Sequence, residues 1–212
     1  MALDVYTTYP WSSQRRKELR ELGYKMLHSA HDRRLIEPPY ALDSGAWSAH
    51  LKKQPFDEES YWEVVQRYGP EADWVVLPDI VAGGLPSLEL SRRWLPRVEP
   101  LAPVLIAVQD GLSPSDLEPL VGERVGIFVG GGTEWKLQTL PQWGRLKQRT
   151  GCWLHVGRVN SAKRINQCRS AGVDSVDGSG LSRWFSPDRA RGMEHHDRIQ
   201  SELKQLHLWG DK

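Results

Sequence analysis

The chain has 212 residues, enough for one domain with a sizeable core and at the short end of the range for α/β barrels. Its two cysteines, Cys152 and Cys168, lack the spacing of a zinc site and are too few for a disulfide framework. The first residues do not resemble a secretion signal, and no apolar run reaches membrane-spanning length. These features argue against exported disulfide-rich and membrane-embedded classes, and they favour a reduced, cytoplasmic protein with no membrane partner.

Short strand-like runs recur along the chain, and each ends in a polar or glycine-rich loop. Eight such runs are found, at residues 5–8, 24–29, 40–45, 73–79, 104–109, 125–129, 152–156 and 175–177. Helix-like stretches follow most of them, at residues 12–22, 58–68, 87–94, 115–120, 133–147 and 162–171. Strands that alternate with helices indicate repeated β/α units, and eight units close a TIM barrel. We therefore predict a compact, single-domain (β/α)8 barrel over residues 1–186, with a C-terminal helix at residues 187–212 that packs on it.

The ends of the predicted helices carry recognisable signals. Ser161 and Thr133 stand where N-caps belong, because a hydroxyl can accept a hydrogen bond from the first turn. Gly23 and Gly172 stand where a helix-ending glycine is expected.

Four of the strand-like runs carry a carboxylate or amide side chain at or near their end: Asp43, Asp79, Gln109 and Asp177. Alternate residues of a strand share a face, so each polar end defines the face that points into the barrel. The opposite faces carry apolar residues, which are Leu42, Val76, Ile106, Val108 and Val176. In a barrel the apolar faces pack under the helices, and the polar strand ends converge at the mouth where barrel active sites are built.

Each of these signals has a plain structural alternative when it is taken alone. Asp177 lies in the sequence DGSG and could simply cap the turn, and Asp110 and Asp174 are expected to bond locally. The run of glycines at residues 130–132 fits a tight turn as well as a phosphate-binding loop. His155 could be a hydrogen-bonded core histidine.

Charge is distributed unevenly although the net charge is only +1. Residues 145–191 contain ten Lys or Arg and three Asp or Glu, which makes this part of the chain a candidate for binding a polyanion. The alternative is that these cations form the solvated faces of helices. The ten tryptophans fit packing against the barrel better than stacking on bases.

Six motifs in chain order give the chain a resemblance to a known family. They are DSGAW at residues 43–47, PDIV at 78–81, AVQDG at 107–111, VGGG at 129–132, HVGRV at 155–159 and AGVDSVDGSGLSR at 171–183. Their ordered set resembles the tRNA-guanine transglycosylase superfamily across residues 40–183. The resemblance implies a (β/α)8 barrel that exchanges a guanine in nucleic acid for a 7-deazaguanine base. The residues offer no metal site and the exchange needs no redox or metal cofactor, so we predict none.

The resemblance also implies a role for each matching residue. Asp177 would be the nucleophile that attacks the anomeric carbon of the sugar, and Asp43 would be the general acid and base. The remaining substrate-binding residues would be Trp47, Asp79, Gln109, Gly130, Gly131, Gly132 and His155. Trp47 would stack on the base, Asp79 and Gln109 would read guanine, and His155 would lie near the other face of the base. Flanking phosphates would be held by Arg158, Lys163, Arg164, Arg183, Arg189 and Arg191.

The residue types suit this chemistry independently of the resemblance. Cleavage of an N-glycosidic bond through an oxocarbenium-like state needs one carboxylate to capture the sugar and a second group to handle the proton of the base. Guanine presents N–H donors that match a carboxylate and an O6 acceptor that matches an amide N–H. Because the anomeric carbon is buried in a duplex, the nucleotide would be flipped out or bound as single strand.

The chain departs from family members that act on tRNA, since it lacks their cysteine-rich zinc insert and has less sequence around the core. A compact, zinc-free form is more similar to the branch that modifies DNA in phages and some bacteria. The leading prediction is therefore a DNA guanine transglycosylase. The alternatives are the same exchange on tRNA and a non-catalytic subunit that binds nucleic acid for a partner. A sugar-phosphate isomerase is disfavoured because no Lys or Glu ends a strand.

Overall fold

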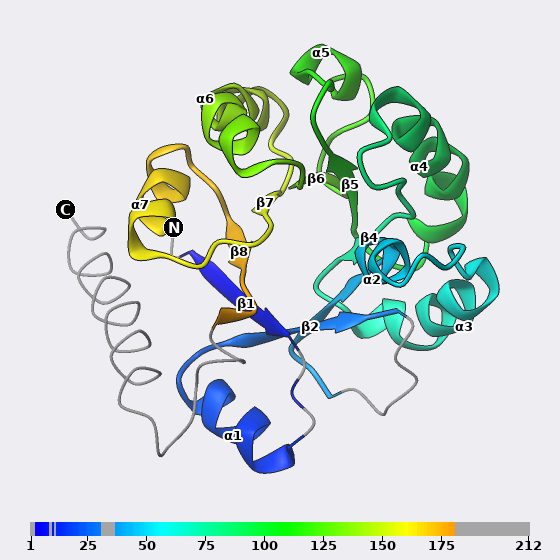
Figure 1. The fold of residues 1–212 in the computed structure, drawn as a ribbon, viewed down its shortest axis with the longest axis vertical. Helices are drawn as coiled ribbons and strands as arrows, with labels where there is room; N and C mark the ends of the chain where they lie inside the picture. The colour runs from blue at the N-terminus through cyan, green and yellow to red at the C-terminus, as the bar shows by residue number, and fades with distance from the viewer. Residues whose placement is uncertain (1–2, 9, 11, 31–36, 181–212) are drawn as a thin grey trace.

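The computed structural model describes residues 3–8, 10, 12–30 and 37–180, and its parallel strands form a closed eight-stranded barrel in the order β1 to β8. The strands are β1 (Asp4–Thr8), β2 (Lys25–Ser29), β3 (Tyr40–Asp43), β4 (Val75–Val76), β5 (Val104–Val108), β6 (Val125–Val129), β7 (Leu154–Val156) and β8 (Ser175–Asp177). Pairing of β8 with β1 closes the ring, with Asp177 opposite Tyr6. The predicted single-domain (β/α)8 barrel is confirmed (Figure 1).

Helices surround this ring and connect successive strands (Figure 1). They are α1 (Ser13–Glu21), α2 (Ala46–Leu51), α3 (Glu58–Tyr68), α4 (Gly84–Val98), α5 (Pro114–Leu117), α6 (Thr133–Thr150) and α7 (Ala162–Ser170), with a 3-10 turn at η1 (Gly69–Glu71). None of the helices in the described ranges is long and apolar enough to cross a membrane. The C-terminal helix predicted at residues 187–212 lies outside the described residues.

Local signals explain most helix ends. The Ser161 hydroxyl accepts a hydrogen bond from the Arg164 N–H, as predicted for an N-cap. Gly23 and Gly172 adopt positive φ after α1 and α7, which confirms their helix-ending role. The prediction for Thr133 is wrong, because Gly132 is the N-cap of α6 and Thr133 is already helical.

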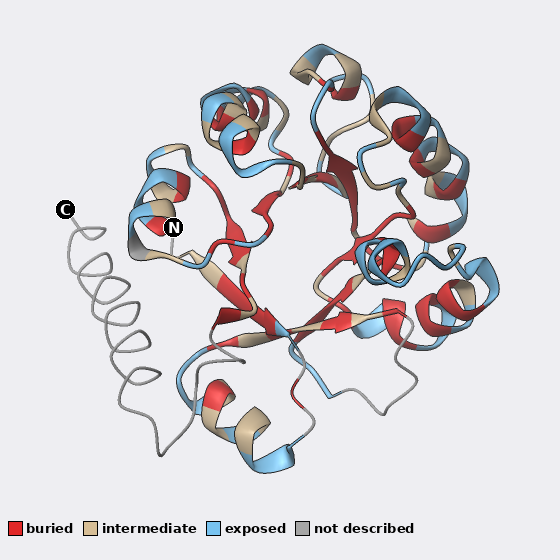
Figure 2. Ribbon diagram, in the orientation of Figure 1, coloured by how far each residue is buried: buried red, intermediate tan, exposed pale blue. Residues whose placement is uncertain are grey.

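Two apolar layers hold the barrel together. Figure 2 shows that buried residues are concentrated in the strands and on parts of the surrounding helices. The outer layer packs the helices on the strands and includes Leu42, Ile106 and Val176, as predicted. The inner layer fills the barrel with large and small side chains: Tyr6, Ala41, Trp74, Val76, Leu105 and Ala107, flanked by Leu27, Phe128 and Trp153. A filled interior is typical of eight-stranded barrels, and it leaves only the strand ends for a site.

Strand β4 differs from the prediction in length and in orientation. The ladder covers only Val75–Val76, and Pro78, which has no N–H to donate, follows shortly after it. Val76 points into the barrel, whereas Val75 and Leu77 belong to the outer layer, so the predicted faces of this strand are reversed. Asp79 nevertheless reaches the mouth, because the chain beyond Leu77 is no longer a strand and does not alternate.

An ion cluster lies at the opposite end of the barrel from the carboxyl ends of the strands. The Lys25 ammonium is 2.8 Å from Asp4 Oδ2 and 3.1 Å from Asp73 Oδ2, and Asp73 also accepts a hydrogen bond from the Tyr6 hydroxyl at 2.6 Å. Burial lowers the pKa of Lys25, but its hydrogen bonds to the two carboxylates outweigh burial and raise the pKa overall. These contacts link β1, β2 and the start of β4.

We expect Gly126→Ala to destabilise the barrel. A Cβ at Gly126 would lie 2.5 Å from both Leu105 Cδ2 and the Trp153 carbonyl oxygen, so two strands would have to shift. Such overpacking costs about 1–3 kcal/mol of unfolding free energy. Urea denaturation measures the loss, and Gly122→Ala, with open space around its Cβ, is the matched control. Equal stability of the two variants would contradict the packing described for the inner layer.

Candidate active site at the mouth of the barrel

The four polar strand ends meet at the mouth, as the chain order predicts. Asp43 ends β3, Asp177 ends β8, Gln109 follows β5, and Asp79 follows β4. Gln109 bonds directly to Asp79, and the charges of Asp79 and Asp177 both act on Asp43. Carboxyl groups from three strands are therefore close enough to influence one another in a region that burial withdraws from water.

The surroundings of Asp43 favour its protonated form. Its Oδ1 accepts a hydrogen bond from the Gly45 N–H at 2.7 Å. Burial raises the pKa of Asp43 to about 7; the Gly45 N–H opposes this shift, and the charges of Asp79 and Asp177 add to it. A carboxyl group with a pKa near neutrality can both donate and accept a proton at physiological pH.

Asp79 and Gln109 form a connected network beside Asp43. Asp79 Oδ1 accepts from the Ser44 hydroxyl at 2.9 Å, and Asp79 Oδ2 accepts from Gln109 Nε2 at 3.0 Å. The Gln109 amide also donates to the Ile80 carbonyl at 3.0 Å and accepts from the Ala82 N–H. Burial raises the pKa of Asp79 to about 6, against the hydrogen bond from Ser44. The network fixes one carboxylate and one amide side by side, which is the pair predicted to read guanine.

Asp177 stands at the end of a chain of hydrogen bonds. Its Oδ1 lies 3.0 Å from His155 Nε2, and His155 Nδ1 lies 2.8 Å from the Ser175 hydroxyl. The Ser175 hydroxyl accepts in turn from Trp153 Nε1 at 2.8 Å. The Arg158 backbone N–H donates to the same Asp177 Oδ1 at 3.3 Å. Asp177 therefore bonds to β7 and to the loop that follows it, and does not merely cap its own turn.

His155 is fully buried, with its ring inside the barrel. It stacks on Phe128 at a centroid distance of 4.7 Å and meets Trp74 at the same distance. Burial lowers the pKa of His155, and the hydrogen bond to Asp177 opposes this shift. Both ring nitrogens are engaged within the protein. Its predicted place beside a bound base stays a prediction.

The glycines at residues 130–132 shape the loop after β6. Gly131 has φ +71, and a Cβ there would lie 2.5 Å from Asp110 Oδ2. The Gly132 N–H donates to the same oxygen at 2.7 Å. The prediction that Asp110 and Asp174 bond locally is wrong, because both accept from residues far along the chain. Asp110 accepts from Gly132, and Asp174 accepts from the Leu154 N–H at 2.8 Å and from the Lys147 ammonium. The predicted close approach of the backbone at residues 130–132 to a bound base stays a prediction.

Trp47 of helix α2 and Arg158 of the loop after β7 meet at the mouth. Helix α2, which the sequence pattern did not reveal, begins after Gly45 with φ +83 and presents Trp47 with 46% of its surface exposed. The Arg158 guanidinium lies 5.0 Å from the centre of the Trp47 ring and also donates to the Gly131 carbonyl. An exposed indole beside a cation offers one surface for a base and one for a phosphate.

Lys136 is a site residue that sequence reasoning missed. It belongs to α6, where a lysine normally faces water, yet it is only 5% exposed. Its ammonium donates to the Gly157 carbonyl at 2.5 Å. Burial lowers the pKa of Lys136 to about 8; the charge of Arg158 adds to this shift and that of Asp177 opposes it. No sequence signal distinguishes Lys136 from the exposed lysines of the other helices.

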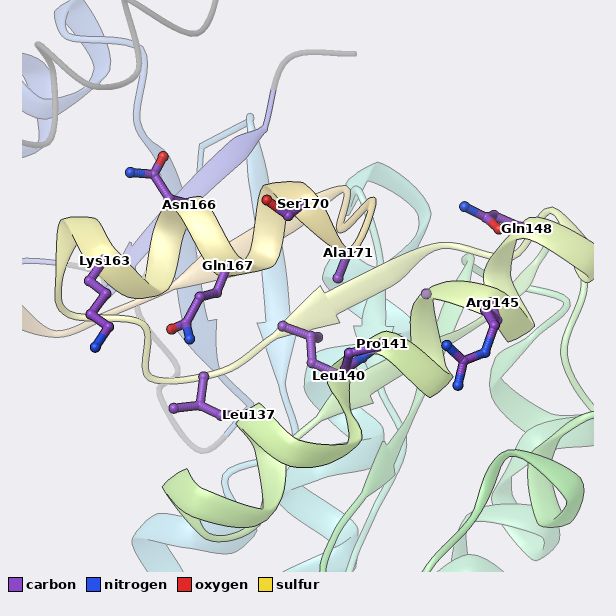
Figure 3. A pocket seen from close by; sticks show the side chains of 11 residues that line it. Leu137, Leu140, Pro141, Arg145, Gln148, Lys163, Asn166, Gln167, Ser170 and Ala171 are labelled. Atoms are coloured by element: carbon purple, nitrogen blue, oxygen red, sulfur yellow. The ribbon is translucent and has the colours of Figure 1, made fainter.

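The remaining basic residues are less directly connected to the mouth. Arg164 belongs to α7 and its charge acts on Lys136. Lys163 lines a groove of about 870 Å³ between α6 and α7, together with Arg145 and Gln167 (Figure 3). This groove lies on the flank of the barrel between two helices. The predicted phosphate-binding residues Arg183, Arg189 and Arg191 lie outside the described residues.

Among the described residues, no group of three or more His, Cys, Asp and Glu side chains is arranged to hold a metal ion. The chain matches no protein-family model and no curated protein. The chemistry of the site therefore has to be inferred from its own geometry.

The raised pKa of Asp43 predicts a pH dependence of stability. In the unfolded chain Asp43 loses its proton near pH 4, whereas the folded protein retains that proton up to about pH 7. The folded state therefore binds more protons between these values, and its stability falls as pH rises from 4 to 7. We expect Asp43→Asn to remove part of this slope and to be about 1–3 kcal/mol more stable than the native chain at pH 8.

Urea denaturation of both proteins from pH 4 to pH 8 measures the difference. Identical slopes in the native chain and in Asp43→Asn would contradict the buried, protonated state assigned to Asp43. Glu89→Gln, at an exposed position of α4, is the control for removal of a surface carboxylate.

Proposed function

We propose that the protein is a guanine transglycosylase that exchanges a guanine in DNA for a 7-deazaguanine base. The observation that carries the proposal is the pairing of two carboxyl groups in contrasting environments at one barrel mouth. Asp43 is desolvated with a pKa near neutrality, whereas Oδ1 of Asp177 accepts from the Arg158 N–H and lies 3.0 Å from His155 Nε2. Double displacement at a sugar requires one carboxyl group of each kind.

In the first step, an oxygen of Asp177 forms a bond to the anomeric carbon, and the bond from that carbon to guanine breaks. The electron pair of the broken bond stays with the guanine, and protonated Asp43 supplies the proton that the leaving base needs. In the second step, Asp43 takes a proton from the incoming 7-deazaguanine, whose nitrogen attacks the same carbon and releases Asp177. Two inversions retain the sugar configuration, and no redox agent is consumed.

Base recognition in this proposal belongs to Asp79 and Gln109. A carboxylate matches the adjacent N–H donors of guanine, and an amide N–H matches its O6. The two side chains already bond to each other at 3.0 Å, which orients both before a base arrives. Both N–H groups of Gln109 are engaged, with Asp79 and with the Ile80 carbonyl, so one of these bonds is exchanged for guanine O6 on binding. Trp47 provides the stacking surface, and a base bound there displaces the Arg158 guanidinium toward a flanking phosphate.

The proposal predicts that the purified chain alone incorporates labelled guanine or a labelled 7-deazaguanine into DNA. Single-stranded DNA, duplex DNA and tRNA transcripts are compared in the same assay. We expect Asp177→Asn to reduce incorporation by at least about a thousandfold, because the nucleophile is lost. Asp43→Asn is expected to reduce it by about 100-fold to 10000-fold, the usual range for a general acid and base.

Three outcomes would overturn parts of the proposal. Label that enters tRNA but never DNA would make the DNA assignment wrong. Incorporation by Asp177→Asn would make the nucleophile assignment wrong. Nucleic-acid binding without incorporation on any substrate would favour the non-catalytic subunit. The surface variant Glu89→Gln should incorporate base at the native rate.

A further inference from the structure

Two separate hydrogen-bond chains end on the same oxygen of Asp177. One runs through side chains of β7 and β8 and reaches Oδ1 through His155 Nε2. The other runs through a peptide group of the loop after β7 and reaches Oδ1 through the Arg158 N–H. Within the described residues, no hydrogen bond joins a donor to Asp177 Oδ2. The two oxygens of this carboxyl group are therefore not equivalent.

The first chain has a fixed direction. Indole Nε1–H can only donate, so the Ser175 hydroxyl accepts from Trp153 and uses its own proton elsewhere. Its other partner is His155 Nδ1 at 2.8 Å. The hydroxyl has a second lone pair, but donating to Nδ1 is the arrangement that gives its proton a partner and leaves Nε2–H to face the carboxyl group, so Nδ1 accepts. A neutral imidazole with an accepting Nδ1 carries its proton on Nε2, and that proton points at Asp177 Oδ1. The rings of Phe128 and Trp74 hold the imidazole in this plane.

The second chain uses the two ends of one peptide bond. The Lys136 ammonium binds the Gly157 carbonyl oxygen at 2.5 Å, and the N–H of the same peptide, which belongs to Arg158, donates to Asp177. A cation at the carbonyl end polarises the peptide and strengthens its N–H as a donor. At 3.3 Å this hydrogen bond to Oδ1 is the longer of the two. The loop is tightly packed here, since a Cβ at Gly157 would lie 2.9 Å from the Phe128 ring and 3.3 Å from Asp177 Oδ1.

We infer that His155 and Lys136 are positioning residues that hold Oδ1 of Asp177, so that Oδ2 is the oxygen that bonds to the sugar. The inference rests on the proposed transglycosylase function. It gives Lys136 and the Trp153–Ser175 pair a role in that reaction, and it assigns His155 to the nucleophile. In the covalent intermediate, Oδ2 carries the sugar and Oδ1 becomes the ester carbonyl oxygen. The same two N–H groups then stabilise Oδ1 in both directions of the reaction.

The tautomer of His155 tests the first chain without any substrate. In ¹⁵N-labelled full-length protein, the two imidazole nitrogens have different chemical shifts in the two neutral forms. We expect His155 to be protonated on Nε2 and unprotonated on Nδ1, and Ser175→Ala to weaken this preference. A proton on Nδ1 and none on Nε2 would overturn the inference, whatever reaction the protein catalyses.

Kinetics of paired variants test both chains in the reaction. Lys136→Met keeps the length of the side chain but removes the charge, and Lys136→Arg retains a cation. His155→Leu removes the donor to Asp177, and His155→Gln retains an N–H. We expect Lys136→Met and His155→Leu each to lower the rate of guanine release in a single turnover by about 10-fold to 100-fold, the usual effect of losing an orienting partner. The affinity for the nucleic-acid substrate should change little. Lys136→Arg and His155→Gln should retain most of the native rate of guanine release.

The outcomes separate failure of the inference from failure of the proposed function. If exchange occurs and folded Lys136→Met and His155→Leu react at the native rate, the inference is wrong and the function stands. If no substrate is exchanged, the function is wrong, and the imidazole shifts still decide the hydrogen-bond arrangement. A structure of the trapped intermediate with the sugar on Oδ1 would also overturn the inference. For a variant that does not fold, the native tautomer and the other pair of variants provide the test.

Discussion

The closed ladder of parallel strands is the constraint on which the site depends. Each strand of the ring hydrogen-bonds to two neighbours, and pairing of β8 with β1 places Asp177 opposite Tyr6 in register. Because all strands run the same way, their carboxyl ends open onto one rim. Residues far apart in the chain, such as Asp43 and Asp177, are thereby brought within electrostatic reach. Loss of closure at any one strand would separate them.

At the mouth, burial disfavours the charged forms of the ionisable side chains, and hydrogen bonds offset this effect to different extents. Asp43 has one backbone donor, and burial prevails, so its carboxyl group retains a proton to near neutral pH. Asp177 has two partners on one oxygen, the Arg158 N–H and His155 Nε2. Lys136 is also buried, with a carbonyl and no carboxylate as its hydrogen-bond partner among the described residues. Two Asp side chains on one rim thus have hydrogen-bond partners that differ in number and direction.

The sequence was sufficient to predict the barrel, the approximate position of every strand and the four polar strand ends, because alternation and glycine turns are local signals. It misassigned the faces of β4, since Pro78 ends the strand and the pattern was extended beyond it. It missed α2, which is short and begins at a glycine. It also missed Lys136, because the burial of a helical lysine depends on the loop that covers it, and that loop follows another strand.

Arg158 performs two tasks with different parts of one residue. Its N–H contacts Asp177, whereas its guanidinium extends to Gly131 and Trp47. Every residue type except proline supplies that N–H, and the backbone φ of +58 is one that glycine and asparagine adopt readily. Glycine or asparagine can therefore replace the side chain at this position and leave the N–H that contacts Asp177 in place. In the proposed transglycosylase, position 158 separates the group that selects the substrate from the group that supports the nucleophile.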